Sequence, residues 1–420
     1  MNRVKLGELL RIKHGYAFKS ENYVTSSPYA LVTLANISSS NSFRFDQEKT
    51  TFYGASFPEE FILHTDDLIM PLTEQVIGLF GNSAFIPSMK EIWFVLNQRV
   101  GKVIPNEGKA DKYYLHYLLS TEIVREQLEH RASGTKQRNI SPDDVYDVTV
   151  VVPELNVQQK IGKALYCLEA KVNVNNAIND NLQQQLRLMY DYWFNQFDFP
   201  NEEGKPYRAS GGKMQYSFRL KRDIPEGWTE ESVISNSISV PIKPGVERFS
   251  TKSYLATADV NGTRLSSGSL IDYETREGRA NMQPTVSSVW FAKMKNSIKH
   301  LFLNREMKQL IDSTILSTGF CGLQCTEKSF EYISAFIEHS YFEDVKNILA
   351  HGATQESVNN DDLLGLGMLV PTSEVLELFH AKAKPLYAQI SRNICENQKL
   401  TEIRDWLLPM LMNGQATISD

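Results

Sequence analysis

One stretch of sequence occurs twice in the chain at a fixed separation, and this repeat limits the folds that the chain can adopt. The first copy starts at Gly134 with Gly-Thr-Lys-Gln-Arg, and the second starts 218 positions later at Gly352 with Gly-Ala-Thr-Gln-Glu. The same offset relates Pro153 to Pro371. A constant offset across several residue types predicts two copies of one building block, each about half of the 420 residues.

A heptad pattern follows each of the two prolines. Its positions are spaced alternately by four and three residues, which is typical of a long helix that packs along one seam. The first seam contains Ile161, Leu165, Leu168, Val172, Asn175, Asn179, Leu182 and Leu186, and the 218-residue offset places Ile390, Asn393, Asn397, Leu400 and Leu407 in the second. Pro385 lies inside the second helix and predicts a kink or a late start there.

Two asparagines interrupt each seam at matching places. If the helices pack antiparallel about the centres of both seams, Asn175 faces Asn397 and Asn179 faces Asn393. Each amide carries a donor and an acceptor, so each pair could satisfy itself, and sliding one helix would leave amides against leucine or isoleucine. The asparagines would then fix the register. Alternatively, the four amides are exposed where the helices separate, or the heptads belong to an ordinary helical hairpin in a globular core.

The repeat divides the chain into two mixed domains and two long helices. Short apolar runs at 30–34, 67–70 and 93–96 predict strands, and 113–128 has helical spacing. We therefore predict an α+β fold with a pseudo-twofold internal repeat, in which two long antiparallel helices form a coiled coil. The expected segments are a first mixed domain at 1–153, a first helix at 154–197, a polar glycine-rich linker at 198–222, a second mixed domain at 223–371 and a second helix at 372–413.

Composition and motifs exclude several classes of function. The chain is 42% apolar and 22% charged, it has no apolar run of about 18 residues, and its N-terminus does not look like a secretory signal. We therefore expect a cytoplasmic protein without membrane contact, whose four cysteines are reduced core thiols. Phosphate-binding loops, dinucleotide-binding glycine motifs and the Asn/Asp-Pro-Pro-aromatic tetrapeptide of adenine methyltransferases do not occur in the sequence. We predict no catalytic site, no cofactor and no metal site.

Basic residues gather in polar, glycine-containing segments, where arginine and lysine could bind phosphates or guanine and glutamine could bind adenine. The candidate nucleic-acid contacts are Lys13, His14, Lys19, Lys136, Gln137 and Arg138 in the first copy, and Lys243, Arg248, Lys252, Arg264, Arg276 and Arg279 in the second. For each of them the alternative is a solvated surface charge. The net charge of −6 argues against a DNA binder that acts alone, because phosphate neutralisation dominates the affinity of such proteins.

Six segments occur in an informative order. They are Lys5-Leu-Gly-Glu-Leu-Leu, Leu96-Asn-Gln-Arg-Val-Gly-Lys-Val-Ile-Pro, Ser133-Gly-Thr-Lys-Gln-Arg-Asn-Ile-Ser, Pro153-Glu-Leu-Asn-Val-Gln-Gln-Lys-Ile, Ile224-Pro-Glu-Gly-Trp228 and Leu400-Thr-Glu-Ile-Arg-Asp-Trp-Leu-Leu-Pro409. In this order the chain resembles, over nearly its whole length, the specificity subunits of type I restriction-modification systems. The segment from Pro371 departs from the pattern because it lacks the glutamine of the first copy, and Ser317-Thr-Gly-Phe is only a faint echo of the Leu96 segment.

The resemblance implies a non-catalytic subunit whose two mixed domains are target-recognition domains for a bipartite double-stranded DNA sequence. It also implies two methyltransferase subunits and endonuclease/translocase subunits as partners, which would supply the basic surface that this acidic chain lacks. Two other functions stay open at this point. One is a DNA nuclease or methyltransferase with unrecognised motifs, which methyl transfer by the chain alone would reveal. The other is a helical scaffold that binds only proteins.

Overall fold

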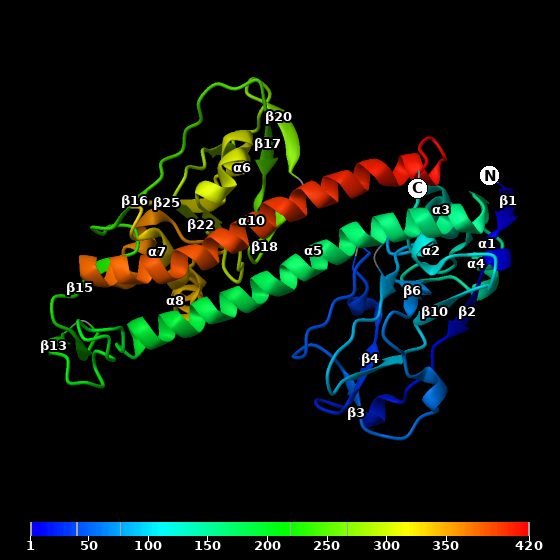
Figure 1. The fold of residues 1–420 in the computed structure, drawn as a ribbon, viewed down its shortest axis with the longest axis horizontal. Helices are drawn as coiled ribbons and strands as arrows, with labels where there is room; N and C mark the ends of the chain where they lie inside the picture. The colour runs from blue at the N-terminus through cyan, green and yellow to red at the C-terminus, as the bar shows by residue number, and fades with distance from the viewer. Residues whose placement is uncertain (1, 39–40, 76, 219, 267, 419–420) are drawn as a thin grey trace. The chain divides into compact units, whose positions relative to one another are not determined.

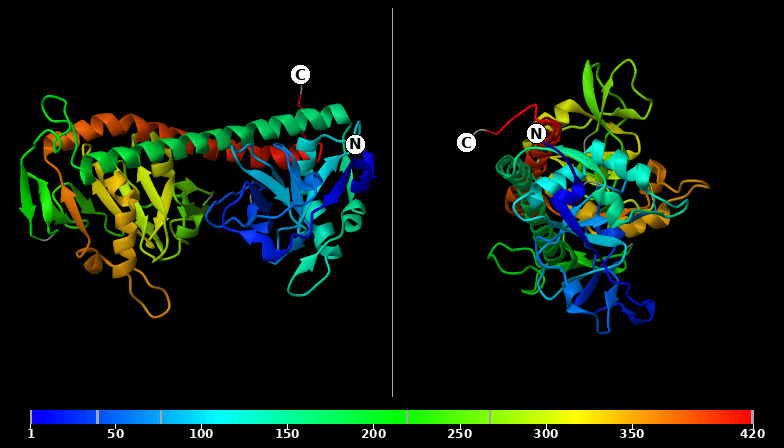
Figure 2. Two further views of the ribbon diagram at one scale, coloured as in Figure 1. Left: turned by 90° about the horizontal axis from the view of Figure 1, so that it is seen from below. Right: turned by 90° about the vertical axis from the view of Figure 1, so that its right-hand side faces the viewer.

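The computed structural model of the chain describes residues 2–38, 41–75, 77–218, 220–266 and 268–418. The chain forms two compact units, Met1–Ala170 with Glu402–Asp420 and Lys171–Thr401 (Figures 1 and 2). Each unit contains one mixed domain and adjoining segments of two long helices, α5 (Leu155–Tyr190) and α10 (Ser373–Met412). Within the described ranges, no helix is both long enough and apolar enough to cross a membrane.

The mixed domain of the first unit is built around two four-stranded sheets. Its strands are β1 (Asn2–Lys5), β2 (Leu10–His14), β3 (Tyr23–Val24), β4 (Tyr29–Val32), β5 (Phe52–Tyr53), β6 (Leu68–Pro71), β7 (Thr73–Glu74), β8 (Ala84–Phe85), β9 (Trp93–Leu96), β10 (Val100–Pro105), β11 (Arg138–Asn139) and β12 (Thr149–Val152). Its helices are α1 (Leu6–Leu9), α2 (Lys112–Leu119), α3 (Glu122–Arg131) and α4 (Pro142–Tyr146). One sheet has the order β2-β10-β6-β8. The other has the order β3-β5-β4-β9, in which β4 and β9 are parallel.

The mixed domain of the second unit has a closely similar plan. Its strands are β13 (Met214–Ser217), β14 (Arg222–Pro225), β15 (Thr229–Ser232), β16 (Ser239–Pro241), β17 (Thr251–Leu255), β18 (Val260–Asn261), β19 (Arg264–Leu265), β20 (Ser269–Asp272), β21 (Ala280–Met282), β22 (Ser288–Ala292), β23 (His300–Leu303), β24 (Thr314–Ser317), β25 (Phe320–Cys325) and β26 (Gly367–Val370). Its helices are α6 (Lys308–Ser313), α7 (Phe330–Glu338), α8 (Ser340–Leu349) and α9 (Asn360–Leu363). Its four-stranded sheets have the orders β16-β25-β22-β23 and β20-β17-β24-β21, and β17 and β24 are parallel.

The C-terminal parts of the two domains match element by element at the 218-residue offset. Helix α3 spans 122–131 and α8 spans 340–349, while β12 spans 149–152 and β26 spans 367–370. In both domains this last strand pairs antiparallel with an early strand, β1 in the first and β15 in the second. The sequence repeat therefore corresponds to a repeated unit of structure.

Burial of apolar residues explains why each domain packs on the long helices. In the first unit, Leu115 and Leu119 of α2 share a core with Ile161 and Leu165 of α5. In the second unit, α7 is buried along almost its whole length and shares a core with Phe379 of α10. Removal of these apolar surfaces from water is the main force that holds each domain on its helix segments.

The structure confirms the three predicted strands of the first domain as β4, β6 and β9. The predicted helical region 113–128 contains two helices, because the hydroxyls of Ser120 and Thr121 bond back to carbonyls of the preceding turn. The prediction of a late start for the second helix is wrong, since α10 begins at Ser373 and continues through Pro385. Proline lacks the N–H that would donate within the helix, yet α10 does not end at this position.

The predicted linker at 198–222 is more ordered than its polar composition indicates. It contains β13, which pairs with β14, and it follows a short π-helix at Asp191–Asn195. The Phe199 ring stacks on Tyr207 at 4.6 Å and on Trp228 at 5.4 Å between ring centroids. Polar, charged and glycine residues make up most of the sequence between 198 and 222, which is why composition alone does not reveal the packing.

Candidate nucleic-acid interface

Two loops of the second domain lie side by side and carry four of the predicted contacts. The loop 242–250 follows β16 and the loop 273–279 follows β20. They meet where Phe249 packs edge-on against Tyr273, and the Gly245 nitrogen donates at 2.8 Å to the Asn281 carbonyl of β21, just after the second loop. We call these segments the second-domain basic loops. They and the adjoining strand β17 carry Lys243, Arg248, Lys252, Arg276 and Arg279.

The cations of the second-domain basic loops differ in how firmly they are held. Arg276 lies 3.9 Å from the centre of the Tyr273 ring and donates to the Tyr273 carbonyl. Arg248 pairs with Glu274 at 2.5 Å, and Lys252 donates to Gln283. Lys243 and Arg279 are exposed, and their side chains have no partner among the residues that the structure describes. These two cations are therefore the most available to a phosphate or a base edge.

Arg264 lies apart from these loops and has an internal partner. Its guanidinium makes two contacts of 3.0 and 3.1 Å with the carboxylate of Asp180 on α5. The neighbouring Thr263 hydroxyl accepts from Gln183, also on α5. Arg264 thus attaches the β18–β19 hairpin to the long helix, and its contact with DNA stays a prediction.

The predicted basic-aromatic cluster of the first domain is only partly free. Lys13 donates to the backbone carbonyl and the carboxylate of Glu60, at 2.6 and 2.9 Å. His14 and Lys19 are exposed. Between them, Gly15 packs so closely that a Cβ atom would lie 2.1 Å from the Asn97 carbonyl oxygen. This contact joins the turn after β2 to the segment after β9. Lys19 lies 3.9 Å from Glu21, but both side chains are exposed, so His14 and Lys19 stay the more accessible of the three.

The repeated glycine segment forms the same turn in both domains. Gly134 and Gly352 have φ angles of 110° and 138°, a region that favours glycine. A Cβ atom at Gly134 would lie 2.1 Å from the Gln137 carbonyl oxygen, and one at Gly352 would lie 2.5 Å from that of Gln355. A capping box follows each turn, closed by Asp144 in the first domain and by Asp362 in the second. The repeated glycine and aspartate residues therefore shape the turn and the helix that follows it.

Arg138, another of the predicted contacts, has two internal partners next to the same turn. Its guanidinium lies 3.0 Å from the buried carboxylate of Glu74 and donates to the Glu129 carbonyl. The residue at the equivalent position of the second domain is Glu356, which pairs with Lys295 at 2.9 Å. Each copy thus holds its turn with one ion pair, in which the turn residue is the cation in the first domain and the anion in the second.

Two residues of the same turn stay candidates for contacts with DNA. Lys136 is exposed, and the described residues offer its ammonium no partner. The Gln137 amide donates to the Asn139 side chain at 3.3 Å and is partly exposed. We keep both residues as candidates because neither is committed to a buried contact.

The seam asparagines pair as the offset predicts. The Asn175 amide donates to Asn397 at 2.9 Å, and the Asn393 amide donates to Asn179 at 2.8 Å. Residue numbers rise on α5 as they fall on α10, so the helices run antiparallel within the second unit. The alternative of fully exposed amides is wrong, since Asn175, Asn179 and Asn393 are 1%, 7% and 4% exposed.

The asparagine pairs do not satisfy themselves, contrary to the prediction. Each pair makes one hydrogen bond, and further bonds run to neighbouring polar residues. Asn175 also donates to Glu396, Asn397 donates to Asn176, and Gln389 donates to Asn393. We call the following set the amide network: Lys171, Asn175, Asn176, Asn179, Gln389, Asn393, Glu396 and Asn397. The Asn175 amide, together with Lys171, holds the pKa of Glu396 below its ordinary value.

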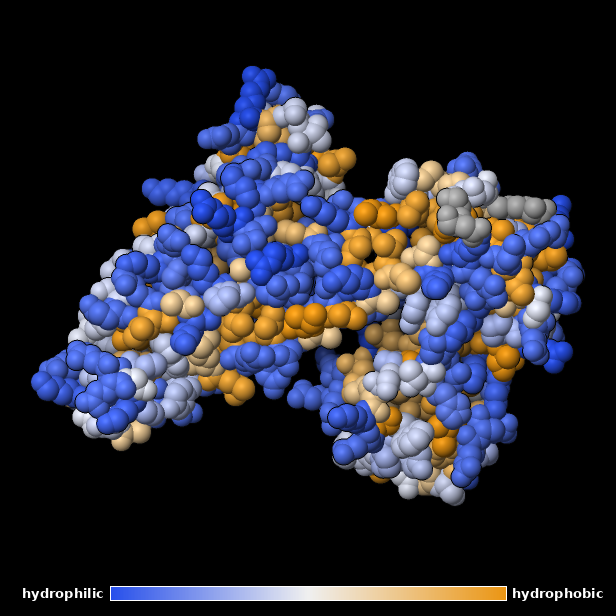
Figure 3. All heavy atoms as spheres, in the orientation of Figure 1, coloured by the Kyte–Doolittle hydropathy of each residue, from blue (hydrophilic) through white to orange (hydrophobic). Residues whose placement is uncertain are grey.

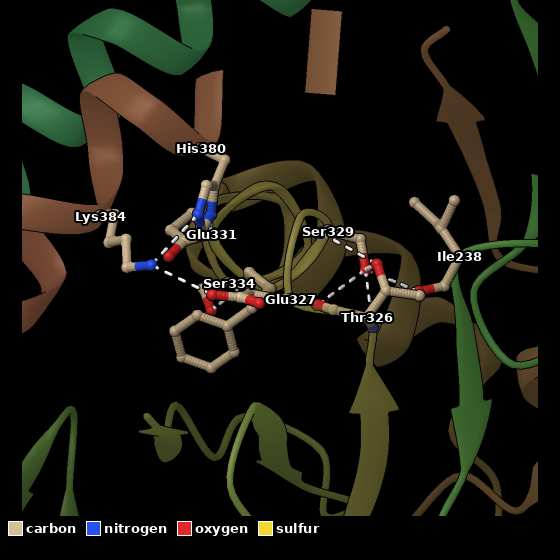
Figure 4. Close-up of polar contacts among 9 residues, drawn as sticks. Ile238, Thr326, Glu327, Ser329, Glu331, Ser334, His380 and Lys384 are labelled. Carbon is tan, nitrogen blue, oxygen red and sulfur yellow. Dashed lines mark hydrogen bonds and ion pairs between the residues drawn. The ribbon is translucent and has the colours of Figure 1, made fainter. Parts of the chain in front are cut away.

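Sequence analysis missed the ionisable residues that attach each domain to a long helix. In the second unit, the His380 ring on α10 lies 2.7 Å from the buried Glu331 carboxylate of α7 (Figure 4). Burial raises the pKa of Glu331, although His380 opposes this shift. In the first unit, Glu169 of α5 accepts from the Tyr117 hydroxyl at 2.9 Å and lies 3.4 Å from His116. Because the two members of each pair are distant in sequence, no local sequence motif predicts these contacts.

The long helices also expose apolar residues. On the face shown in Figure 3, hydrophilic residues cover most of both domains, and apolar residues gather in a stripe along the long helices. Leu188 of α5 and Tyr192 of the π-helix that follows it are 63% and 40% exposed, and Ile403 and Trp406 of α10 are 46% and 65% exposed. Leu188 and Trp406 are equivalent positions of the repeat. Exposed apolar groups of this size are typical of surfaces that bind other proteins.

Comparisons with known proteins agree with this architecture. Residues 1–184 match the family described as the type I restriction modification DNA specificity domain. The chain is 23% identical over 342 residues to the type I restriction enzyme MjaIX specificity subunit of Methanocaldococcus jannaschii, covering 77% of this chain and 73% of that protein. It is 22% identical over 375 residues to the HindI specificity subunit of Haemophilus influenzae, covering 77% and 81%.

A solved structure shows the same fold. The specificity subunit of the type I restriction-modification system from M. genitalium superposes with a TM-score of 0.52 at 12% identity, covering 98% of this chain and 95% of that one. The family match, the two relatives and the shared fold agree with the six ordered sequence segments. Over residues 1–184 the chain matches the DNA specificity domain of type I restriction-modification systems, and over 77% of its length it is similar to specificity subunits of such systems.

Proposed function

We propose that the chain reads a bipartite DNA target, with one mixed domain for each half-site. The observation that carries this proposal is the repeat of topology. One four-stranded sheet of the first domain has the same strand order as one four-stranded sheet of the second, and the C-terminal parts of the two domains contain matching helices and strands. Two readers of similar shape suit a duplex whose target has two separated parts. The domains proposed as readers are residues 1–153 and 223–371.

The two readers are related by a near-twofold rotation in this proposal, and α5 and α10 form an antiparallel coiled coil between them. The antiparallel amide pairs inside the second unit support this arrangement. Helices of 36 and 40 residues would be about 55–60 Å long at about 1.5 Å per residue. An unread spacer in the target would then have a length that follows from the helices.

The proposed DNA contacts are the cations and polar side chains that internal partners leave available. In the second domain these are Lys243 and Arg279, with Arg248, Lys252 and Arg276 beside them in the basic loops. In the first domain they are His14, Lys19, Lys136 and Gln137, with Lys13 nearby. Loops of the two domains share little sequence beyond the repeated framework, so we expect them to read different half-sites.

Partner subunits complete the complex in this proposal. Two methyltransferase subunits would dock on the long helices, where the equivalent residues Leu188 and Trp406 are exposed and have the exposed apolar residues Tyr192 and Ile403 near them in sequence. Endonuclease/translocase subunits would join the complex in addition. Because the chain carries a net charge of −6, the partners would supply much of the positive surface around the duplex.

Exchange of one domain tests the proposal. Residues 224–350 are replaced by the equivalent segment of a relative with a known target, and methylated bases are mapped in host DNA with and without the hybrid chain. We expect one half-site to change while the other half-site and the spacer stay the same. A change in both half-sites would contradict independent reading by the two domains, and unchanged methylation would contradict DNA reading by the second domain.

A further inference from the structure

We infer that the amide network selects the register of α5 against α10, and that it thereby sets the spacer between the two half-sites. The link to the spacer rests on the proposed function, whereas the selection of register rests on the geometry of the second unit alone. The network lies at the centre of both seams and joins the helices by direct side-chain hydrogen bonds.

One register extends from the network to the end of the second unit. Asn175 pairs with Asn397, and each step forward on α5 from Asn175 matches an equal step backward on α10 from Asn397. This rule places Trp193 opposite Phe379. Their rings are in contact, with centroids 5.5 Å apart and planes at 63°. The amide pairs and this aromatic pair therefore belong to the same alignment.

The apolar layers of the seam do not distinguish this register from others. A slide by one heptad would place Leu182 against Ala383 in place of Ile390, which exchanges one apolar contact for another. Apolar burial is non-directional, so these layers lose little selectivity when they move. The asparagine layers behave differently, because the same slide would place Asn175 against Ile390 and Asn179 against Leu386.

Burial makes the asparagine layers selective. Amides that are almost wholly buried and lose their partners cannot recover hydrogen bonds from water, so each alternative register carries unsatisfied polar groups. A polar residue in a helical seam is known to specify register in this way at some expense of stability. The side-chain amide oxygen of Asn175 is buried and has no hydrogen-bond partner within the described residues. This is consistent with selection for register rather than for stability.

Two exposed ion pairs between the second domain and the helices are weaker constraints than the amide network. Arg264 pairs with Asp180 of α5, and Glu306 pairs with Arg392 of α10. Their side chains are between 40% and 60% exposed. Exposed ion pairs of this kind are readily replaced by water and salt. Among the described residues, the side-chain hydrogen bonds that join α5 directly to α10 are those of the amide network.

Disulfide formation in the full chain tests the register without reference to DNA. The seam variant replaces Asn175, Asn179, Asn393 and Asn397 by leucine, in a background in which Cys167 and Cys395 are changed to serine. A cysteine at Leu182 is combined with a cysteine at Ile390, which is the native register, or at Ala383, which is one heptad away. A heptad is about 10 Å along the helix, so a single register cannot bridge both pairs.

We expect the native seam to form only the Leu182→Cys, Ile390→Cys disulfide. We expect the seam variant to form both, with at least a tenfold gain in the yield of the Leu182→Cys, Ala383→Cys disulfide. Asn173→Leu is the matched control, since Asn173 is exposed on the same helix outside the seam. Thermal denaturation checks that the seam variant is folded. A folded seam variant that forms only the native disulfide overturns the inference.

Methylation by the assembled complex then tests the link to the spacer. A set of DNA targets keeps both half-sites and varies the spacer by up to about four base pairs. We expect the native chain to support methylation at one spacer length and the seam variant to support it at one further length or more. An altered register with an unchanged spacer would overturn the link to the spacer and would count against the proposed function. The assignment of register would then still stand.

Discussion

The two units attach their domains to the long helices at equivalent positions but with different chemistry. In the first unit α2 lies directly on α5, and a Cβ atom at Gly162 would be 2.5 Å from the Tyr114 backbone nitrogen. The equivalent residue in the second unit is His380, which pairs with the buried Glu331 (Figure 4). The repeat therefore preserves where the helices meet, while the side chains at the contact decide how strongly and at which pH they hold.

A second pair of equivalent positions shows the reverse assignment of polar groups. Glu169 in the first unit is bonded to Tyr117 and lies beside His116. Its counterpart in the second unit is Tyr387, whose buried hydroxyl has no hydrogen-bond partner among the described residues. The same position of the repeat thus carries a polar group that is hydrogen-bonded in one copy and a hydroxyl without a described partner in the other.

Of the substitutions that test this difference between the units, removal of Glu169 should lower stability the most. Glu169→Ala leaves the buried His116 without its charge partner and the Tyr117 hydroxyl without its acceptor. Loss of one member of such a buried pair costs about 3–5 kcal/mol. We expect the first unit to lose this amount of stability, measured by hydrogen exchange of α2 peptides. Protection of α7 peptides in the second unit is the control, and equal loss in both units would contradict separate attachment.

The ion pair of the repeated turn allows a test with two neighbouring cations. Arg138→Ala strands the buried Glu74 carboxylate, which should cost about 1–3 kcal/mol of stability. Lys136→Ala removes an exposed cation, so we expect unchanged stability and a weaker dependence of DNA affinity on salt. The slope of log affinity against log salt should fall by about 0.9 for one lost phosphate contact.

Denaturation of the full chain and DNA-binding titrations of the assembled complex measure these two effects. Lys5→Ala provides a matched control, because Lys5 is an exposed lysine of the same domain that pairs with Asp147. If Arg138→Ala leaves stability unchanged and instead lowers the salt slope, then Arg138 contacts DNA and its pair with Glu74 does not stabilise the domain.

Sequence patterns predicted the framework because it depends on local and periodic signals. The offset from Gly134 to Gly352 identified a turn that only glycine accommodates, and the spacing of four and three residues identified both long helices. The pairing of Asn175 with Asn397 followed from the symmetry of each seam. These features are encoded by residue order alone, so one sequence was enough to predict them.

The chemistry of the contacts between elements could not be predicted in the same way. Arg138 and Arg264 looked like DNA contacts because they are cations in polar loops, yet Glu74 and Asp180 bind them from distant parts of the chain. The packing of Phe199 against Trp228 was equally hidden in a polar segment. Partners brought together by folding leave no local signal, and so which cations remain available becomes visible only in the structure.

Buried glutamates of the second unit should give its attachment a pH dependence that the first unit lacks. Burial raises the pKa of Glu338 at the end of α7 to about 7, although Arg187 opposes the shift. The folded state therefore binds a proton more tightly than the unfolded state, whose value is near 4.5. The stabilising contribution is fully present below about pH 4.5 and is lost as the pH rises through 7.

Glu338→Gln should remove this dependence, because glutamine stays neutral. We expect protection of α7 peptides from hydrogen exchange to rise as the pH falls from 8 to 5 in the native chain, after correction for intrinsic exchange rates, and to stay flat in the variant. Glu169→Gln is the control of opposite sign. Burial raises the pKa of Glu169, but contacts from His116 outweigh burial and leave a lowered value. Its contribution is therefore constant between pH 5 and 8 and is lost only as the pH falls through that lowered pKa, below about 4.5.

The smallest effect should come from Tyr387, the counterpart of Glu169. Its ring is buried and contacts Phe302 and Phe330, with ring centroids 5.9 and 6.0 Å away. Tyr387→Phe keeps these contacts and removes only the unpartnered hydroxyl, so we expect the second unit to be unchanged or more stable by about 1 kcal/mol. Chemical denaturation monitored by hydrogen exchange of α7 and α10 peptides measures this change. A loss of 1 kcal/mol or more would mean that the hydroxyl has a partner, and the contrast between Glu169 and Tyr387 would then disappear.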